Sequence, residues 1–217
     1  MNSTEQRDPT LERSLELRGS PDITLSIDHL WGGAPLDHTH AQVGLTLTPT
    51  ALLVQVSARW MRDAPPPGPP GPLWGLWAYE VVELFVVGAH ERYLELELSP
   101  HGHHLALSLE GVREPVRWAL PLEVDVRRGE RTWEASLSLP RALLPSPQAQ
   151  KKCAKSPQKV SARYQLNAFA CWGQGKDRRF ALSSPLGEGS PDFHRVHLFP
   201  SYALSERFHT EQGADLL

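Results

Sequence analysis

The chain has 217 residues, of which 40% are hydrophobic and 22% charged, as in a globular protein large enough to bury one core. Its formal net charge of -3 argues against a general nucleic-acid binder, which would carry a strong basic excess. No apolar run approaches the roughly 20 residues that span a bilayer, and the N-terminus lacks the apolar segment of a secretory signal. The two cysteines, Cys153 and Cys171, do not make a disulfide framework. Together these features predict a cytoplasmic protein that binds neither nucleic acid nor a membrane.

The first ordered segments are predicted to form a β-hairpin. Residues 43–47 and 52–56 alternate apolar and polar side chains, and the turn-like Thr48-Pro-Thr-Ala51 separates them. A connection of four residues sets Leu47 opposite Leu52, and the apolar faces of the two strands then coincide. Both the alternation of apolar and polar side chains and the matching register therefore support this hairpin.

A loop rich in proline and glycine, residues 64–72, comes next. Its composition predicts a stiff surface loop, and the alternative is a polyproline segment that docks into an aromatic groove of a partner protein. Trp74 and Trp77 follow this loop, and Trp172 ends a later strand beside Gly173-Gln-Gly175. Tryptophans in such places either cap the core or stack on a flat ligand face, such as that of a sugar.

A central strand and a second hairpin are predicted after this loop. Residues 79–87 are apolar on both faces apart from two glutamates, which is typical of a strand covered on both sides. Leucines then alternate along residues 92–99 and 103–109. A two-residue turn at His101-Gly102 would set Leu98 opposite Leu105 and gather these leucines on one face.

The opposite face of that hairpin is predicted to be acidic. It carries Glu95, Glu97 and His104, because side chains alternate along a strand. A loop of even length before the hairpin adds Glu80 to this face, and a loop of odd length adds Glu83. The face is either a solvated surface or a polar site for a sugar, another polyol or a hard cation such as Ca²⁺. Paired carboxylates could also hydrolyse a glycoside, but the sequence holds no catalytic, zinc or dinucleotide motif, so no cofactor is expected.

The rest of the chain predicts short strands and irregular segments. Further strands are expected at 122–127, 132–139, 162–172, 179–182 and 194–199, with one helical turn at 141–144. Residues 1–20 and 204–217 are expected to be tails, and the lysine-rich segment 146–159 a disordered basic insertion. Short strands without helical periods between them predict one all-β domain at 21–203, an antiparallel β-sandwich that is jelly-roll-like.

Four stretches of the chain resemble a family of vertebrate proteins. They are Asp28-His-Leu-Trp-Gly-Gly33, Leu76-Trp-Ala-Tyr-Glu-Val-Val-Glu-Leu-Phe85, Tyr93-Leu-Glu-Leu-Glu-Leu-Ser-Pro-His-Gly102 and Pro191-Asp-Phe-His194. Over about residues 27–202 the chain looks like the uncharacterised chromosome four open reading frame thirty-three proteins. This resemblance implies no established activity.

A more distant resemblance is to the family-nine carbohydrate-binding modules and their DOMON-like relatives, which are β-sandwiches. The matching pieces are Trp77, Val82-Glu83-Leu-Phe85, Tyr93-Leu-Glu95, Ser99-Pro-His-Gly102, Asn167, Arg179 and Ser184-Pro185. The chain departs from that pattern at Pro185, which no tryptophan precedes, and in lacking a secretory signal. The resemblance implies the sandwich of a carbohydrate-binding module, while the departures argue against binding of extracellular polysaccharide.

We therefore predict a non-catalytic binding module for a small polar ligand, a sugar or glycan. The residues expected to bind it are Trp77, Glu83, Glu95, Asn167, Trp172 and Arg179. The tryptophans would stack on the ligand and the others would hydrogen-bond to it, with Pro191-Asp-Phe-His194 as a further polar candidate. One alternative is a protein-interaction module that docks through residues 64–72 or 146–159, and a second is a carboxylate-based hydrolase.

Overall fold

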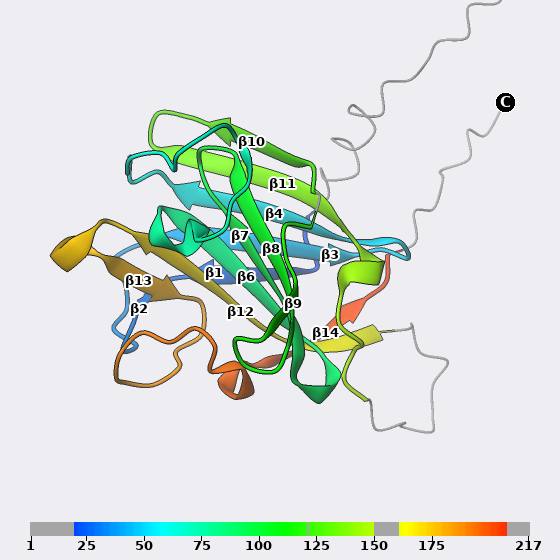
Figure 1. Cartoon of the computed structure of the whole chain (residues 1–217). Coiled ribbons are helices and arrows are strands. Elements are labelled where there is room, and N and C mark those ends of the chain that lie inside the picture. Colours follow the sequence, from blue (N-terminus) through cyan, green and yellow to red (C-terminus); the bar gives the residue numbers. More distant parts are fainter. Residues whose placement is uncertain (1–19, 121, 150–160, 208–217) are drawn as a thin grey trace, which may run out of the picture.

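Two β-sheets packed face to face make up the structure, a computed structural model that describes residues 20–120, 122–149 and 161–207 (Figure 1). The strands described pair antiparallel, apart from β5 and β8, which pair in parallel. The predicted antiparallel β-sandwich is thus confirmed.

The five-stranded sheet is built around the first hairpin. Its strand order is β1 (Ile23–Ile27), β3 (Ala41–Leu47), β4 (Ala51–Arg59), β11 (Thr132–Pro140) and β10 (Val124–Arg128). Leu47 pairs with Leu52 and Leu45 with Val54, so the predicted register is confirmed.

The nine-stranded sheet carries most of the polar residues singled out above. Its strand order is β2 (His29–Leu30), β13 (Arg179–Leu182), β12 (Ser161–Trp172), β6 (Val81–Val87), β7 (Arg92–Leu98), β8 (His103–Glu110) and β5 (Gly71–Pro72), with β14 (Ser201–Ser205) beside β12 and β9 (Pro115–Arg117) beside β8. β6 lies between β12 and β7, as expected of a central strand.

The turn between β7 and β8 is one residue longer than predicted. It consists of the three residues Pro100–Gly102, closed by a bond from Ser99 N to His103 O of 3.0 Å. Gly102 has φ +83°, the left-handed conformation that turns of this length need. Leu98 therefore lies opposite His104 and not opposite Leu105, so the predicted pairing is wrong by one position.

This shift decides which side chains share a face, because a slip of one residue turns a whole strand over. Glu95 lies opposite Leu107 and Glu97 opposite Leu105. His104 leaves the predicted acidic face and turns toward the other sheet. The acidic face is therefore mixed with leucines, and it is not a uniformly polar surface.

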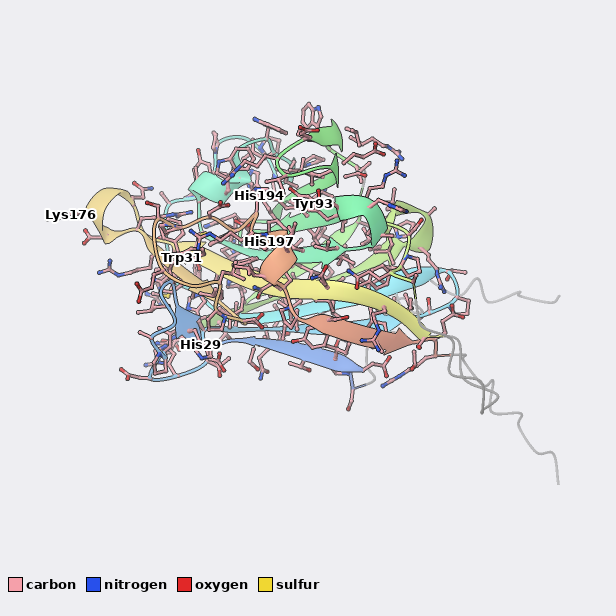
Figure 2. The ribbon with its side chains drawn as sticks, turned by 90° about the horizontal axis from the view of Figure 1, so that it is seen from below. His29, Trp31, Tyr93, Lys176, His194 and His197 are labelled. Carbon is pink, nitrogen blue, oxygen red and sulfur yellow. The ribbon has the colours of Figure 1, made fainter. Side chains whose placement is uncertain are left out.

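Both faces of the nine-stranded sheet are covered. Between the sheets lies a largely aliphatic core that also encloses Trp133. The other face carries a second core with Phe85 and Phe169. Val196 and Phe199 close this core, and they belong to the segment around His197, which crosses this face of the sheet (Figure 2). The face that was expected to be either a solvated surface or a polar site is thus covered by a second core, and it is not a solvated surface.

Short 3-10 turns connect the strands. They are η1 (Leu76–Ala78), η2 (Ala89–Glu91), η3 (Arg141–Leu143), η4 (Gly175–Asp177) and η5 (Val196–Leu198). The turn η3 confirms the predicted helical turn. The predicted strand at 194–199 is wrong, because this segment bonds within itself, from Leu198 N to Arg195 O at 3.0 Å, while it crosses the sheet.

The expected tails and insertion lie largely outside the described residues. Ser146, the first residue of the expected insertion, is hydrogen-bonded to the rest of the domain: its carbonyl oxygen accepts the N–H of Ala89 at 2.8 Å. At the other end, β14 continues to Ser205, and Arg207 Nε donates to Asp22 Oδ1 at 2.7 Å. Within the described part of the chain, no helix is long and apolar enough to cross a membrane.

Candidate functional site

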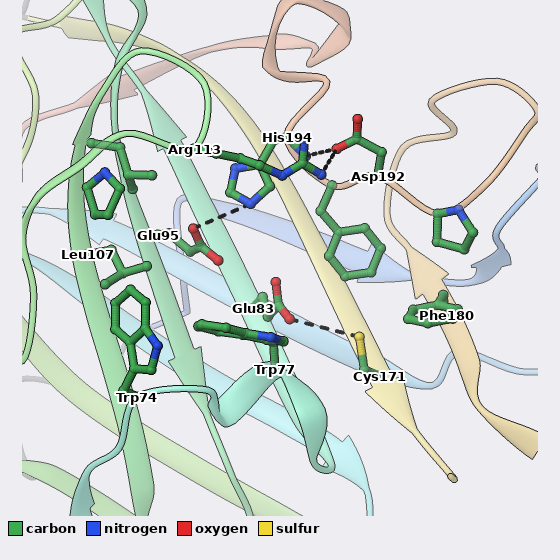
Figure 3. A pocket seen from close by; sticks show the side chains of 14 residues that line it. Trp74, Trp77, Glu83, Glu95, Leu107, Arg113, Cys171, Phe180, Asp192 and His194 are labelled. Atoms are coloured by element: carbon green, nitrogen blue, oxygen red, sulfur yellow. Dashed lines mark hydrogen bonds and ion pairs between the residues drawn. The ribbon is translucent and has the colours of Figure 1, made fainter. Parts of the chain in front are cut away.

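A pocket of about 430 Å³ opens on the covered face of the nine-stranded sheet (Figure 3). Strands β6, β7, β8 and β12 supply its floor, and the loop before β6 and the residues around 191–194 supply its walls. Its lining is mostly aromatic and apolar. The charged or titratable side chains in it are Glu83, Glu95, Arg113, Cys171, Asp192 and His194.

The length of the β6–β7 loop brings the glutamates together. Val87 pairs with Tyr93, so residues 88–92 form a loop of odd length. Glu83 therefore lies opposite Glu97 and joins the face that carries Glu95. The carboxylate of Glu80 lies elsewhere and accepts two backbone N–H bonds.

Burial determines the protonation of these carboxyl groups, since Glu83, Glu95 and Glu97 are at most 4% exposed. Loss of hydration raises the pKa of Glu95 to about 8, although the charge of Arg113 opposes the shift. Burial also raises the pKa values of Glu83 and Glu97 well above 4.5, and the neighbouring carboxyl groups raise them further. The free pocket is therefore lined by protonated carboxyl groups at neutral pH, which can donate as well as accept hydrogen bonds.

These carboxyl groups have few partners within the protein. The thiol of Cys171 donates to Glu83 Oε1 over 3.9 Å. Among the described residues, Oε2 of Glu95 and both carboxyl oxygens of Glu97 have no hydrogen-bond partner. Buried polar atoms are nearly always bonded, so Glu95, which lines the pocket, has unused capacity for a ligand.

His194 lies next to Tyr93 in the wall of the pocket (Figure 2), and its imidazole is neutral. Its Nδ1 lies 2.7 Å from the hydroxyl of Tyr93, and that hydroxyl oxygen accepts the N–H of Arg113 at 3.0 Å. We infer that the hydroxyl, whose oxygen already accepts this bond, donates its proton to Nδ1, which leaves the proton of the neutral ring on Nε2, 4.0 Å from Glu95 Oε2. Burial first, then the positive charge of Arg113, lowers the pKa of His194 to about 4.

An ion pair fixes the rim above His194. Nη2 of Arg113 donates to Oδ1 of Asp192 at 2.8 Å. The same oxygen accepts the backbone N–H of His194 at 3.0 Å. The turn after β8 is thereby tied to the segment 191–194, and the cation at the rim is already paired.

The facing wall is formed by tryptophans (Figure 3). Trp74 and Trp77 are 50% and 43% exposed and meet edge to face, with ring centroids 5.3 Å apart. Trp118, also exposed, extends this cluster at 5.5 Å from Trp74. Arg178 holds the loop in place by donating to the carbonyls of Trp77 and Tyr79 at 2.5 and 3.0 Å. Indole surface is therefore presented to the pocket by an anchored loop.

Three of the residues predicted to bind a ligand lie outside this pocket. Asn167 is fully buried, and its amide is occupied: Nδ2 donates to Ser184 O at 2.9 Å, and Oδ1 accepts three hydrogen bonds. Trp172 lies on the other face of the sheet and stacks on His40 with centroids 4.1 Å apart. Arg179 pairs with Trp172 across the β12–β13 ladder and shares its face.

The other three, Trp77, Glu83 and Glu95, all line the pocket. Other residues also line the pocket, and the sequence patterns gave little indication that they belong to a site. Arg113 lies in the turn after β8, where no periodic pattern singles it out. Asp192 and His194 belong to one of the stretches that carry the family resemblance, which was the available signal for them.

The described residues contain no group of three or more His, Cys, Asp or Glu side chains placed to hold a metal ion. The Ca²⁺ alternative for the acidic face therefore has no candidate ligand set in the described ranges.

The fold is an antiparallel β-sandwich, and a solved carbohydrate-binding module shares it. The chain belongs to the UPF0462 family: it is 36% identical over 189 residues to the Homo sapiens UPF0462 protein C4orf33, covering 83% of this chain and 87% of that protein. It is 34% identical over 190 residues to the Danio rerio homologue, covering 82% and 87%. No protein-family model matches the chain.

Solved structures share the fold. A "putative carbohydrate-binding protein" from Bacteroides uniformis ATCC 8492 matches with a TM-score of 0.65 and 17% identity, over 94% of this chain and 95% of its own. A family 9 carbohydrate-binding module from Caldicellulosiruptor kristjanssonii, in complex with cellotriose, matches with a TM-score of 0.51 and 11% identity, over 87% and 85%. Both resemblances that the sequence motifs suggested are thereby confirmed, the second at the level of fold.

Proposed function

We propose that this pocket binds a sugar or a similar small polyol without reacting with it. The observation that carries the proposal is the indole wall of Trp74 and Trp77 facing the buried carboxyl groups of Glu83 and Glu95 in one cavity. A pyranose ring has an apolar face that packs on an indole and a rim of hydroxyl groups that needs polar partners. The volume of about 430 Å³ lies within the usual range for small-ligand sites.

The protonation of the floor supports the same ligand. A protonated carboxyl group can donate to one hydroxyl oxygen and accept from another, which suits neutral polyols. Glu95 Oε2, bonded to no described residue, is such an acceptor. The shared fold of a family 9 carbohydrate-binding module in complex with cellotriose adds support from outside the chain.

A panel of monosaccharides and oligosaccharides, screened by thermal unfolding, tests the proposal. A ligand at a hundred times its dissociation constant stabilises the folded state by about 2.7 kcal/mol, which raises the melting temperature by roughly 2–4 °C for a chain of this size. A shift with a sugar class supports the proposal. A flat response to the whole panel contradicts it and favours the protein-interaction alternative.

For a sugar that binds, Trp77→Ala is expected to weaken the affinity about tenfold, or 1.4 kcal/mol, because the stacking surface is lost. Trp172→Ala is the matched control, since it removes the same side chain from the other face of the sheet. Isothermal titration calorimetry below the unfolding range of both variants measures the effect. Equal affinities for the two variants would show that the sugar binds elsewhere.

A further inference from the structure

We propose that this pocket prefers a sugar that carries a protonated primary amine, a hexosamine, over the corresponding neutral sugar, with the ammonium group against Glu83 and Glu95. The inference rests on the proposed function of the same pocket and names its ligand class.

The balance of charge in the pocket is the first argument. Arg113 is paired with Asp192 at 2.8 Å, and His194 is neutral because burial holds its pKa near 4. The guanidinium group of Arg178 donates hydrogen bonds to the carbonyl oxygens of Gly173, Trp77 and Tyr79. The charges of Arg113 and Arg178 act on Glu95 and Glu83 from a distance, but neither arginine forms an ion pair with them among the described residues, and a ligand ammonium group would be the first cation to do so.

The unpartnered carboxyl oxygen is the second and independent argument. Glu95 is 4% exposed and points into the pocket (Figure 3), yet Oε2 bonds to no described residue. Nε2 of His194 lies 4.0 Å from it. An ammonium group carries three donors on one atom, enough to serve Glu95 and Glu83 together, whereas a hydroxyl group donates only once.

The aromatic wall adds to the preference. Trp74 and Trp77 line the same cavity, and an indole ring attracts a cation that lies over its face. Because its pKa is near 8, Glu95 releases its proton to solvent at pH 7 when an ammonium group binds beside it. A hydrogen bond between an ammonium group and the resulting carboxylate is about twice as strong as one between neutral groups. Both contributions vanish when the amine is acetylated, although the sugar ring remains.

Calorimetric titration of the full chain with glucosamine, glucose and N-acetylglucosamine at pH 7 tests the inference. Glucosamine is expected to bind about tenfold more tightly than glucose, which corresponds to 1.4 kcal/mol, and N-acetylglucosamine no more tightly than glucose. Glucose binding as tightly as glucosamine would overturn the inference and leave the proposed function standing. Failure of all three sugars to bind would overturn the inference, and only a flat response to the whole panel of sugars would overturn the proposed function as well.

Two variants and one further ligand locate the effect. In Glu95→Gln, which keeps the shape of the side chain, the ratio of glucosamine to glucose affinity is expected to fall toward one. Glu134→Gln removes an exposed carboxylate from the other sheet and should keep the ratio. A ratio unchanged in Glu95→Gln would contradict the assignment. So would methylamine binding as tightly as glucosamine, because the site would then recognise an amine without its sugar.

Discussion

At the scale of single residues, the pocket is defined by the protonation of its carboxyl groups. Glu83, Glu95 and Glu97 occupy neighbouring positions of β6 and β7 and face a layer that also holds leucine and phenylalanine. Ionising them without a partner there would cost several kcal/mol, so they stay protonated. The same groups are thus donors for a neutral ligand and potential anions for a cationic one.

The raised pKa of Glu95 has a consequence for stability. Its folded-state pKa is about 8 and its ordinary value 4.5, so the folded chain keeps a proton that the unfolded chain releases. This contribution is fully present below about pH 4.5 and is lost as the pH rises toward 8. The lowered pKa values of His40 and His194, each about 4, act in the opposite direction, mainly below pH 7, because histidine with its ordinary pKa of 6.5 is mostly neutral above that pH.

In the window from pH 7 to pH 8 the histidines are mostly neutral in both the folded and the unfolded chain, so the carboxyl groups dominate the change in stability. We expect the free energy of unfolding to fall across it, and to fall less steeply in Glu95→Gln, by up to about 1.4 kcal/mol per pH unit. Urea denaturation at both ends of the window measures the two slopes, with Glu134→Gln as the control that should keep the wild-type slope. Identical slopes for the wild type and Glu95→Gln would mean that Glu95 is already ionised in the folded protein.

At the scale of elements, the two hairpins show what the sequence can and cannot predict. In the β3–β4 hairpin the apolar pattern of both strands admits one register, and that register is the observed one. In the β7–β8 hairpin leucines alternate on both strands, and the pattern alone favoured a single leucine layer. The actual turn is one residue longer, and it places Leu105 beside Glu97.

The other residues of the site could not be predicted from the sequence for a related reason. The odd length of the loop at 88–92 brings Glu83 into the pocket, and the sequence left that length open. Arg113 and His194 come from segments outside the strands, whose positions depend on tertiary packing. Strand alternation could place Glu95 on a face, but it could not show that residues 186–199 cover that face.

Gly102 controls the register of the β7–β8 hairpin. It has φ +83°, and a Cβ added to it would lie 3.0 Å from the Cβ of Pro70. We expect Gly102→Ala to destabilise the fold by about 1–3 kcal/mol, through backbone strain and this contact. Gly68→Ala is a matched control, because Gly68 has the same φ and no atom within 4 Å of the added Cβ. If thermal unfolding showed that both variants lose the same stability, the contact with Pro70 would contribute nothing to the destabilisation.

At the scale of the whole molecule, the chain ties its two sheets together. β12 pairs with β6 along one edge and with β14 and β13 along the other. Beyond β14, the backbone N–H of Arg207 bonds to Leu47 O at 2.8 Å in the five-stranded sheet. The two cores share strands β6, β7, β8 and β12, so the pocket layer has no sheet of its own.

We therefore expect the sandwich core and the pocket layer to unfold in one transition. Far-UV circular dichroism reports on the sheets, and tryptophan fluorescence reports on the pocket wall as well as on Trp133 between the sheets, so the two urea curves should coincide. Leu96→Ala opens a cavity between the sheets and Leu107→Ala one in the pocket layer; both side chains are buried, and each change should cost about 2–5 kcal/mol. Each variant should shift both curves by the same amount. If Leu107→Ala moved the fluorescence curve alone, the pocket layer would unfold separately, and ligand binding would then stabilise that layer without stabilising the sandwich.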